Sequence, residues 1–423
     1  MPLEPSRPPR RFLVPALATL VLVALILAIA ARLAPWELAV GNLVLRSQQG
    51  IGMEFPAPAS GELVEAERRE APVEAAVPGP LNVILMIGDG MGVGQVSTAS
   101  AILRGPAGAL VMESAPVTAL MRTHAGNHLV TDSAASSTAM ATGFKAPKKA
   151  ISVLSDGRVP VTLFEAARAA GVATGLVTTS GLVDATPAGF TAHEVKREHY
   201  AEILDDMLAS DSEVLLGGDW SDFPKALRNE AFQQRIAGID TLAEAAGYEV
   251  ARDLAGLTAA RGPVLGWFPP RGGHGDAHGP ALAETTMLAV ERLAATGTGF
   301  LLLVESEVTD STGHDNDIAS LVAGIAELDA ALAAILDWAA PRGDTLVLVT
   351  ADHDTGGVGI VDGAYEESLA EVRWATTGHT AQWVPLFAFG PGAEEFSGVI
   401  DNTEIGVRIA ELLGIPGFPG IRP

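Results

Sequence analysis

The chain has 423 residues, of which 48% are hydrophobic and 18% are charged, a composition that fits a globular protein with one large domain or two ordinary ones. Its 51 acidic residues against 27 basic ones give a formal net charge of −24, which argues against a nucleic-acid partner, because such a surface needs a basic footprint. The chain has no cysteine, which excludes disulfides and thiolate zinc sites. Any transition metal must therefore be held by His, Asp and Glu.

The N-terminus carries an export signal. Three arginines at positions 7, 10 and 11 precede an uncharged apolar run of twenty residues, 12–31. Twenty apolar residues can cross a bilayer as one helix, and the basic flank favours a cytoplasmic N-terminus. We predict that residues 1–34 form a signal anchor, with a cleaved signal peptide as the alternative, since Ala28-Ile29-Ala30 resembles a cleavage site. Either form places the rest of the chain in the periplasm or at the cell exterior.

Residues 35–80 are rich in Pro, Ala and Glu and are predicted to be a linker, so the main globular domain is predicted to span residues 81–423. Inside it, continuous apolar runs predict strands that are buried on both faces. These runs lie near residues 81–88, 171–180, 300–305, 345–352 and 384–390.

Helical patterns alternate with these strands, at residues 163–170, 281–297 and 318–340. This alternation predicts a doubly wound α/β domain with a mainly parallel central sheet and helices on both faces. Residues 205–280 are less regular and are predicted to be an insertion over one edge of the sheet. The sequence shows no internal repeat.

Polar residues follow four of the predicted strands directly or closely. Because ligand sites in such sheets lie beyond the carboxyl ends of the strands, we expect these side chains to meet at one edge. They are Asp89, Asp184, Glu305 and the adjacent pair Asp352 and His353.

The glycine-rich stretch GDGMGVG, residues 88–94, resembles a dinucleotide-binding fingerprint, but its third glycine position is Val93. We instead expect Asp89 to be the functional group and the glycines to permit a close approach of chain and ligand.

A second motif, ESEVTDSTGHDND at residues 305–317, places Glu305, Asp310 and His314 at spacings of five and four. His353 and His379 add two further imidazoles. Carboxylate and imidazole ligands without cysteine suit zinc, and an oxygen-ligated Mg²⁺ can lie nearby. We therefore predict a multi-metal site.

The segment VTDSAASSTAMATG, residues 130–143, permits two interpretations of Asp132 and Ser133. They are typical caps of the helix that the Ala-rich run predicts. Alternatively, Ser133 is a nucleophile at that helix terminus, where backbone N–H groups attract an anion.

Together these blocks resemble the alkaline phosphatase family over most of residues 81–392. The matching blocks are IGDGMG, TDSAAS, DATPAGFTAHEVKR, VESEVTDSTGH, TADHDTGG and the late GHT. The resemblance implies two zinc ions and one magnesium ion around the nucleophile Ser133, with Arg197 on the phosphate. One zinc would be held by Asp310, His314 and His379, the other by Asp89, Asp352 and His353, and magnesium by Asp89, Asp184, Thr186 and Glu305.

Hydrolysis of a phosphate monoester needs the same groups, namely metal ions, a nucleophile and a cation that binds the phosphate. Two metals about 4 Å apart stabilise the attacking and leaving oxygens of an in-line displacement. Activation of Ser133 beside a metal would give a phosphoserine intermediate, and a planar guanidinium contacts two phosphate oxygens at once. The expected substrates are therefore small phosphate monoesters. Members of the family often form homodimers, and the sequence leaves the assembly open.

The sequence departs from the family pattern at Ser311, where familiar members often carry Lys or His. We expect this change to affect phosphate affinity and pH optimum rather than the reaction class. Two alternatives stay open at this point: another enzyme of the superfamily, such as a phosphodiesterase, and a catalytically silent membrane-tethered binding protein.

Overall fold

A computed structural model describes residues 50–52, 81–105, 108–218, 226–268, 279–364 and 369–422. The predicted membrane segment (12–31) and most of the predicted linker lie outside these ranges. The helices are α2 (Val93–Arg104), α3 (Ser133–Thr142), α4 (Leu163–Ala169), α5 (Ala185–Thr191), α6 (Tyr200–Leu208), α7 (Glu230–Ala237), α8 (Ile239–Ala245), α9 (Leu254–Ala259), α10 (Leu282–Ala294), α11 (Val308–Asp315), α12 (Ile318–Ala339) and α13 (Thr403–Leu412), with short 3₁₀ helices η3 (Val111–Ser114), η5 (Ala226–Arg228) and η6 (Ala393–Phe396).

The strands are β1 (Gly50–Gly52), β2 (Asn82–Gly88), β3 (Val117–Arg122), β4 (Ala173–Gly181), β5 (Val214–Gly218), β6 (Glu249–Ala251), β7 (Val264–Phe268), β8 (Phe300–Ser306), β9 (Thr345–Thr350), β10 (Asp354–Thr355), β11 (Gly359–Ala364), β12 (Leu369–Arg373), β13 (His379–Thr380), β14 (Val384–Phe389) and β15 (Gly398–Asp401). Every predicted apolar run became a strand of the main sheet, namely β2, β4, β8, β9 and β14. The three predicted helices are α4, α10 and α12.

Ten strands form the main sheet, in the order β15-β3-β14-β9-β2-β8-β4-β5-β7-β6. Within the described residues β14 alone runs against its neighbours, since it is antiparallel to both β3 and β9 while the other pairings are parallel. The mainly parallel sheet that the sequence predicts is therefore confirmed. Separately, β11 and β12 form an antiparallel hairpin.

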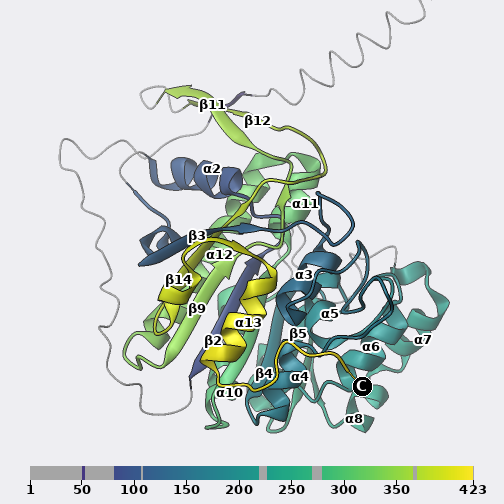
Figure 1. Cartoon of the computed structure of the whole chain (residues 1–423). Coiled ribbons are helices and arrows are strands. Elements are labelled where there is room, and N and C mark those ends of the chain that lie inside the picture. Colours follow the sequence, from purple (N-terminus) through teal and green to yellow (C-terminus); the bar gives the residue numbers. More distant parts are fainter. Residues whose placement is uncertain are drawn as a thin grey trace, which may run out of the picture. The chain divides into compact units, whose positions relative to one another are not determined.

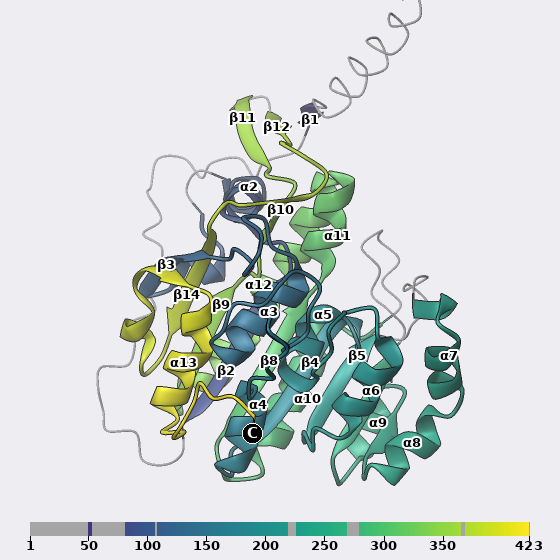
Figure 2. The same cartoon turned by 45° about the vertical axis from the view of Figure 1, so that its right-hand side comes forward.

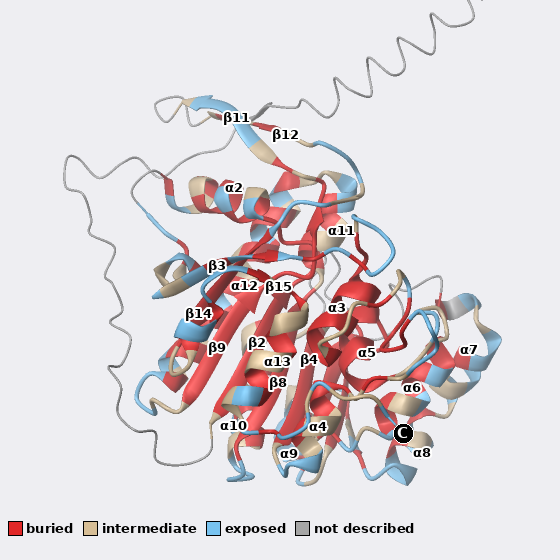
Figure 3. Cartoon of the chain, viewed as in Figure 1, coloured by how far each residue is buried: buried red, intermediate tan, exposed pale blue. Residues whose placement is uncertain are grey.

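Helices cover both faces of this sheet (Figures 1 and 2). One layer contains α10 and α12, with α2 packed on α12, and the other contains α3, α4, α5 and α13. Every residue of β2, β8 and β9 is buried, as parallel strands between two helical layers must be (Figure 3).

Residues 205–280 do more than lie over an edge of the sheet. The described part of this stretch contributes β5, β6 and β7, which extend the sheet beyond β4 by three parallel strands. Short strands between glycines and polar residues carry weak sequence signals, which explains why their pairing was not predicted.

Within the described ranges, α12 is the one helix that is long and apolar enough to cross a membrane. It packs between α2 and α10, and more than half of its residues are buried. This is the pattern of a core helix in a globular domain.

Candidate active site

The carboxyl ends of four neighbouring parallel strands meet at one edge of the sheet, and each delivers a polar side chain there. Asp89 follows β2, and Asp184 follows β4 as the N-cap of α5. Glu305 is the residue before the last in β8. Asp352 and His353 follow β9. The clustering at one edge that the sequence predicts is thus present, and the strands that carry it are adjacent in the sheet.

The first group of candidate ligands consists of Asp310, His314 and His379. Asp310 and His314 are one turn apart on α11, and His379 comes from β13. His314 Nε2 lies 3.3 Å from Asp310 Oδ2 and 3.3 Å from His379 Nε2, and His379 Nε2 lies 3.6 Å from Asp310 Oδ1. A tetrahedral zinc with bonds of about 2.0–2.1 Å has ligand atoms roughly 3.3 Å apart, so these three separations suit one zinc ion.

Hydrogen bonds on the far side of each ring determine which nitrogen faces the group. His314 Nδ1 lies 2.7 Å from the Thr377 carbonyl oxygen, and His379 Nδ1 lies 3.0 Å from the Thr131 carbonyl oxygen. A carbonyl only accepts, so both Nδ1 atoms carry the proton and both Nε2 atoms present lone pairs. Two lone pairs that face each other across 3.3 Å need a cation or a proton between them.

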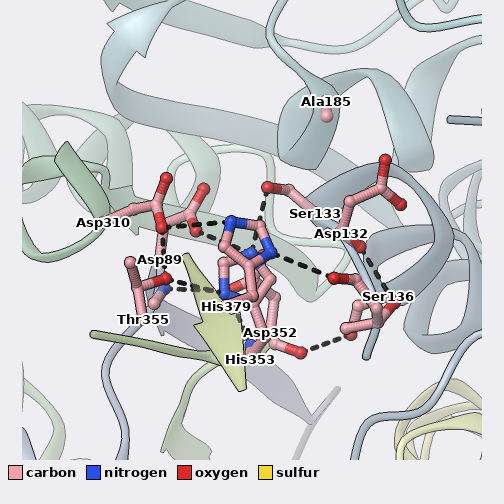
Figure 4. A network of polar contacts seen from close by, with 12 residues as sticks. Asp89, Asp132, Ser133, Ser136, Ala185, Asp310, Asp352, His353, Thr355 and His379 are labelled. Carbon is pink, nitrogen blue, oxygen red and sulfur yellow. Dashed lines mark hydrogen bonds and ion pairs between the residues drawn. The ribbon is translucent and has the colours of Figure 1, made fainter. Parts of the chain in front are cut away.

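The second group consists of Asp89, Asp352 and His353, with the Ser133 hydroxyl beside it (Figure 4). His353 Nε2 lies 3.1 Å from Asp352 Oδ2, 3.4 Å from Asp89 Oδ1 and 3.3 Å from Ser133 Oγ. These separations again match the edges of a zinc tetrahedron. Ser133 is therefore close enough to share a metal with the three ligands.

Thr355 orients the His353 ring. The Thr355 hydroxyl donates its one proton to Asp310 and must therefore accept from His353 Nδ1, which is 3.2 Å away. That bond leaves the His353 Nε2 lone pair facing the second group. Thr355 thus links the two groups, and the His353 and His379 rings stack with centroids 3.7 Å apart. His353 also lies close enough to Asp310 and His379 to count with the first group.

The third group is formed by Asp184, Thr186 and Glu305 and lies next to Asp89. Glu305 is fully buried and accepts a 2.5 Å hydrogen bond from the Thr178 hydroxyl through one oxygen. Asp184 accepts from the Ser180 hydroxyl at 2.7 Å. Carboxylate and hydroxyl oxygens are the ligands that Mg²⁺ prefers.

Unpartnered polar atoms provide a test of whether these groups suit metal ions. Among the described residues, ten buried side-chain polar atoms have no hydrogen-bond partner, and four of them lie in this site, namely Asp89 Oδ1, Asp352 Oδ2, Glu305 Oε1 and the Thr186 hydroxyl. An orphaned buried carboxylate oxygen costs several kcal/mol unless it is paired or coordinates a metal, by an order-of-magnitude estimate. The four atoms belong to the residues predicted as ligands, so the residues fit the expected ions.

Without metals the ionisation of these carboxyls is strongly disfavoured. Burial, helped by the nearby Asp352 and Asp310 charges, raises the pKa of Asp89 well above its usual value. Burial also raises the pKa of Asp352 to about 7 and, together with Asp184, that of Glu305 to about 8. The metal-free site therefore holds protons on these carboxyls, and divalent cations would take the place of those protons and favour the ionised forms.

Ser133 is the first residue of α3, and both interpretations of its segment are compatible with the structure. Asp132 is the N-cap, and its carboxylate accepts from the Ala135 N–H at 3.2 Å. The cap holds the helix terminus so that Ser133, which is 3% exposed, faces His353.

Arg197 approaches from the loop after α5. Its Nη2 donates to Asp184 Oδ1 at 2.7 Å, and its side chain is about a quarter exposed. Burial lowers the pKa of Arg197, but the charges of Asp184 and Asp132 outweigh burial and raise it overall, so the guanidinium stays charged.

The turn after β2 explains the glycines of GDGMGVG. Gly90 has φ +72°, and a Cβ atom there would lie 2.7 Å from the Thr355 hydroxyl and 2.9 Å from Asp310. At Gly90 the absence of a side chain therefore permits close approach of the chain to Thr355 and Asp310, and approach of a ligand there stays a prediction.

Comparisons with known proteins agree with this geometry. The family model described as alkaline phosphatase matches residues 81–366 and 361–415. The chain is 32% identical to alkaline phosphatase 3 of Bacillus subtilis over 78% of this chain and 88% of that protein. The chain belongs to the alkaline phosphatase family.

Other members of this family are comparably similar. Streptomycin-6-phosphate phosphatase of Streptomyces griseus is 33% identical over 84% of this chain and 95% of that protein. The solved alkaline phosphatase of the Antarctic bacterium TAB5 superposes with a TM-score of 0.68 at 28% identity, covering 80% of this chain and 99% of that one. The alkaline phosphatase-like fold is therefore shown over the catalytic domain.

The structure also identifies residues of this phosphatase site that the sequence analysis missed. Thr355, Thr178 and Ser180 each hold a candidate ligand through a hydroxyl. Thr355 could have been noticed in TADHDTGG, two residues after His353, whereas Thr178 and Ser180 carry no local signal because their partners are distant or depend on the turn after β4.

Another missed residue is Glu307, next to the position of Ser311. Burial and the charges of Asp310 and Asp184 raise its pKa well above the usual value. A buried carboxyl therefore lies beside Ser311, and its raised pKa favours the uncharged acid.

Proposed function

We propose that this alkaline phosphatase hydrolyses phosphate monoesters to an alcohol and inorganic phosphate, through a phosphoserine on Ser133. The observation that carries the proposal is the position of the Ser133 hydroxyl, 3.3 Å from His353 Nε2, beside Asp89 and Asp352 and next to the group of Asp310, His314 and His379. Two metal groups beside a nucleophile can stabilise both the attacking and the leaving oxygen of an in-line displacement at phosphorus.

The proposed metals are two zinc ions and one magnesium ion. Asp310, His314 and His379 would hold one zinc and Asp89, Asp352 and His353 the other, while Asp184, Thr186 and Glu305 would hold magnesium with a share of Asp89. When bound, these ions would supply positive charge to the attacking and leaving oxygens and lower the pKa of the serine hydroxyl. Two solved variants of the TAB5 enzyme are described as having Mg bound in a site called M3, which supports magnesium in the family.

The residues of the chain then have the following roles. The planar guanidinium of Arg197 binds two phosphate oxygens, while its Nη2 group also donates a hydrogen bond to Asp184 Oδ1, which keeps the side chain in position. The Ser133 oxygen, having lost its proton to solvent, attacks phosphorus, and the bond from phosphorus to the ester oxygen breaks. The ester oxygen leaves with the bonding electron pair and takes a proton from solvent to give the alcohol. Water attacks the phosphoserine in a second displacement, the Ser133–phosphorus bond breaks, and phosphate leaves. Asp132, the N-cap of α3, keeps Ser133 in place through both displacements.

A monoester preference is supported by the complete set of groups. The nucleophile, the third oxygen-rich group and Arg197 are all present, and a terminal phosphate offers three oxygens for them to bind. A phosphodiesterase would need space for a second organic group on one of those oxygens. A catalytically silent binding protein would be expected to lack a ligand or the nucleophile, and the chain lacks neither.

Competing substrates test the proposal. We expect the full-length protein, supplied with Zn²⁺ and Mg²⁺, to hydrolyse p-nitrophenyl phosphate at least about a hundredfold faster than bis-p-nitrophenyl phosphate, a difference of roughly 2.7 kcal/mol in activation free energy. Faster cleavage of the diester would assign the site to a phosphodiesterase, and cleavage of neither would support a binding protein.

We further propose that residues 12–31 anchor the enzyme in the membrane with the catalytic domain outside the cytoplasm. The basic flank and the twenty-residue apolar run support this. Full-length protein that stays with membranes after a carbonate wash would support the anchor, whereas a soluble form beginning near Ala31 would show a cleaved signal.

A further inference from the structure

Asn402 lies far from Ser133 in the sequence, but a chain of hydrogen bonds connects it to the active site. It is completely buried and occupies the N-cap position of α13, where an Asn side chain ordinarily caps the helix. Here the side chain makes no capping bond. Its amide group instead forms hydrogen bonds with Ser136, inside α3, and with Lys145, three residues after the end of that helix.

The direction of each bond in this chain is fixed. The Lys145 ammonium can only donate, and its Nζ lies 2.6 Å from Asn402 Oδ1, so the amide oxygen of Asn402 faces Lys145. The Asn402 Nδ2 group then faces Ser136 and donates to its hydroxyl at 2.9 Å. Since that hydroxyl is already an acceptor toward Asn402, its own proton is directed to the Asp352 carbonyl oxygen, 2.6 Å away (Figure 4).

That carbonyl belongs to the peptide unit between two candidate metal ligands. Ser136 holds the C=O of the Asp352–His353 peptide, and the N–H of the same peptide donates to Asp352 Oδ1 at 2.9 Å. Gly90 N–H donates to the same oxygen at 3.0 Å. Both ends of the peptide are therefore held, and the remaining oxygen, Asp352 Oδ2, faces His353 Nε2 in the second group.

We propose that Asn402 is a positioning residue for the second metal group: through Ser136 it fixes the peptide that presents Asp352 and His353 to the metal. The inference rests on the proposed function, because it assigns those two residues to a metal ion. It connects the C-terminal segment of the chain to the site, 266 residues from Ser136.

The segment that carries Asn402 is itself held firmly. Its backbone N–H donates to the Arg122 carbonyl at the end of β3, at 3.0 Å. Helix α13 packs closely on α3, since a Cβ atom on Gly406 would lie 2.3 Å from the Met140 carbonyl oxygen. Ser133 and Ser136 are three residues apart on α3, so the same helix presents the nucleophile and holds the Asp352 carbonyl.

The variant Asn402→Asp tests the proposal, because it keeps the shape of the side chain but cannot donate to Ser136. An Asp carboxylate would accept from both Lys145 and Ser136, which would turn the Ser136 proton away from Asp352. The readout is calorimetric titration of the metal-stripped full chain with Zn²⁺ in a His314→Ala background, so that the second group dominates. We expect Asn402→Asp to weaken Zn²⁺ binding about 10–100-fold, as loss of an outer-shell partner does.

The matched control is Thr403→Val, which removes one local hydrogen bond to Asp401 from the same segment without touching Ser136. We expect its Zn²⁺ affinity to equal that of the background. A second variant, Ser136→Ala, should weaken binding to the same degree as Asn402→Asp, and the double variant should bind no more weakly than Ser136→Ala alone, because both changes remove one shared bond.

Unchanged Zn²⁺ affinity in Asn402→Asp, equal losses in Asn402→Asp and Thr403→Val, or additive losses in the double variant would each overturn the positioning role. These outcomes leave the proposed function standing. A wild-type chain that binds no Zn²⁺ would contradict the proposed function and this role together, so the two failures can be told apart.

Discussion

Three histidines in the site have their protonated nitrogen turned away from it. His314 and His379 direct Nδ1 to backbone carbonyls, and His353 directs Nδ1 to the Thr355 hydroxyl. In the metal-free protein a second proton on His314 is favoured, because its hydrogen bond to Asp310 raises its pKa to about 9. A proton therefore takes the place of a cation in the metal-free protein, and zinc must displace it.

Substitution of the single residue Glu305 distinguishes the proposed magnesium site from the two proposed zinc sites. We predict that Glu305→Gln leaves two zinc ions bound and raises the Mg²⁺ concentration for half-maximal stimulation at least about tenfold, because only the third group loses a charged ligand. Metal analysis together with Mg²⁺ titration of activity measures both effects. The control, Glu371→Gln, removes the charge of a residue in β12 that pairs with Arg373 and should respond as wild type does. Loss of zinc with an intact Mg²⁺ response would show that the ligands are divided differently.

At the scale of elements, α3 connects the chemistry to the rest of the fold. It begins at Ser133, ends at Gly143 in the left-handed conformation and is buried along its whole length between α5 and α13. A helix buried on all sides needs small side chains, and nine of the ten residues of SAASSTAMAT, all except Met140, are Ala, Ser or Thr. The small residues thus allow close packing as well as space at the phosphate site.

Gly406 tests how closely α13 approaches α3. Replacing a helical glycine by alanine usually stabilises a protein by up to about 1 kcal/mol. Here we predict that Gly406→Ala instead lowers the free energy of unfolding by about 1–3 kcal/mol, because the added methyl group would overlap the Met140 carbonyl oxygen. Denaturant unfolding measures the change. Gly359→Ala is the control, since its Cβ would meet nothing within 4 Å, and equal effects of the two changes would show that the contact is not tight.

Much of the fold could be predicted because its signals are local. The runs that became β2, β8 and β9 are continuous and apolar, and the residues after them are acidic or histidine. The strands β6 and β7 at one end of the sheet and the bonds of Thr178 and Asn402 could not be predicted, because each depends on a partner that only the folded chain brings near. The division of ligands into groups came from the family resemblance, and no feature of the spacing alone implied it.

At the scale of the whole molecule, the site links metal binding to stability. The ligands lie at the ends of β2, β4, β8 and β9 or directly after them, and on α5, α11 and β13, so the groups exist only in the folded chain. Metals that bind the folded state alone stabilise it. We expect a chelator to abolish activity and lower the melting temperature, and Zn²⁺ to restore most of both.

The pH dependence of the metal-free protein follows from its shifted groups. His353 and His379, whose pKa values are lowered chiefly by burial, bind fewer protons folded than unfolded near pH 6.5, so they make stability rise slightly with pH until the unfolded histidines are neutral, about one pH unit higher. Asp352 and Glu305, with pKa values raised to about 7 and about 8, bind more protons folded than unfolded, so stability falls as pH rises. His314, raised to about 9, acts in the same direction.

Between pH 6.5 and 8 the two buried carboxyls alone should lower the free energy of unfolding of the metal-free protein by about 2 kcal/mol. Denaturant unfolding at several pH values, with and without Zn²⁺ and Mg²⁺, measures this loss. Bound metals should abolish it, because they favour the ionised carboxylates. A metal-free protein that becomes more stable over this interval would contradict the assigned charges.

The central claim is that Ser133 attacks phosphorus, and it is tested most directly by trapping the enzyme with substrate at mildly acidic pH and mapping the phosphorylated peptide. The account predicts phosphate on Ser133 in the wild-type protein. It also predicts that Ser133→Ala folds, binds metals and yields no phosphorylated peptide, with any remaining turnover due to direct attack by water. Phosphate on another residue, or an equal yield from Ser133→Ala, would contradict it.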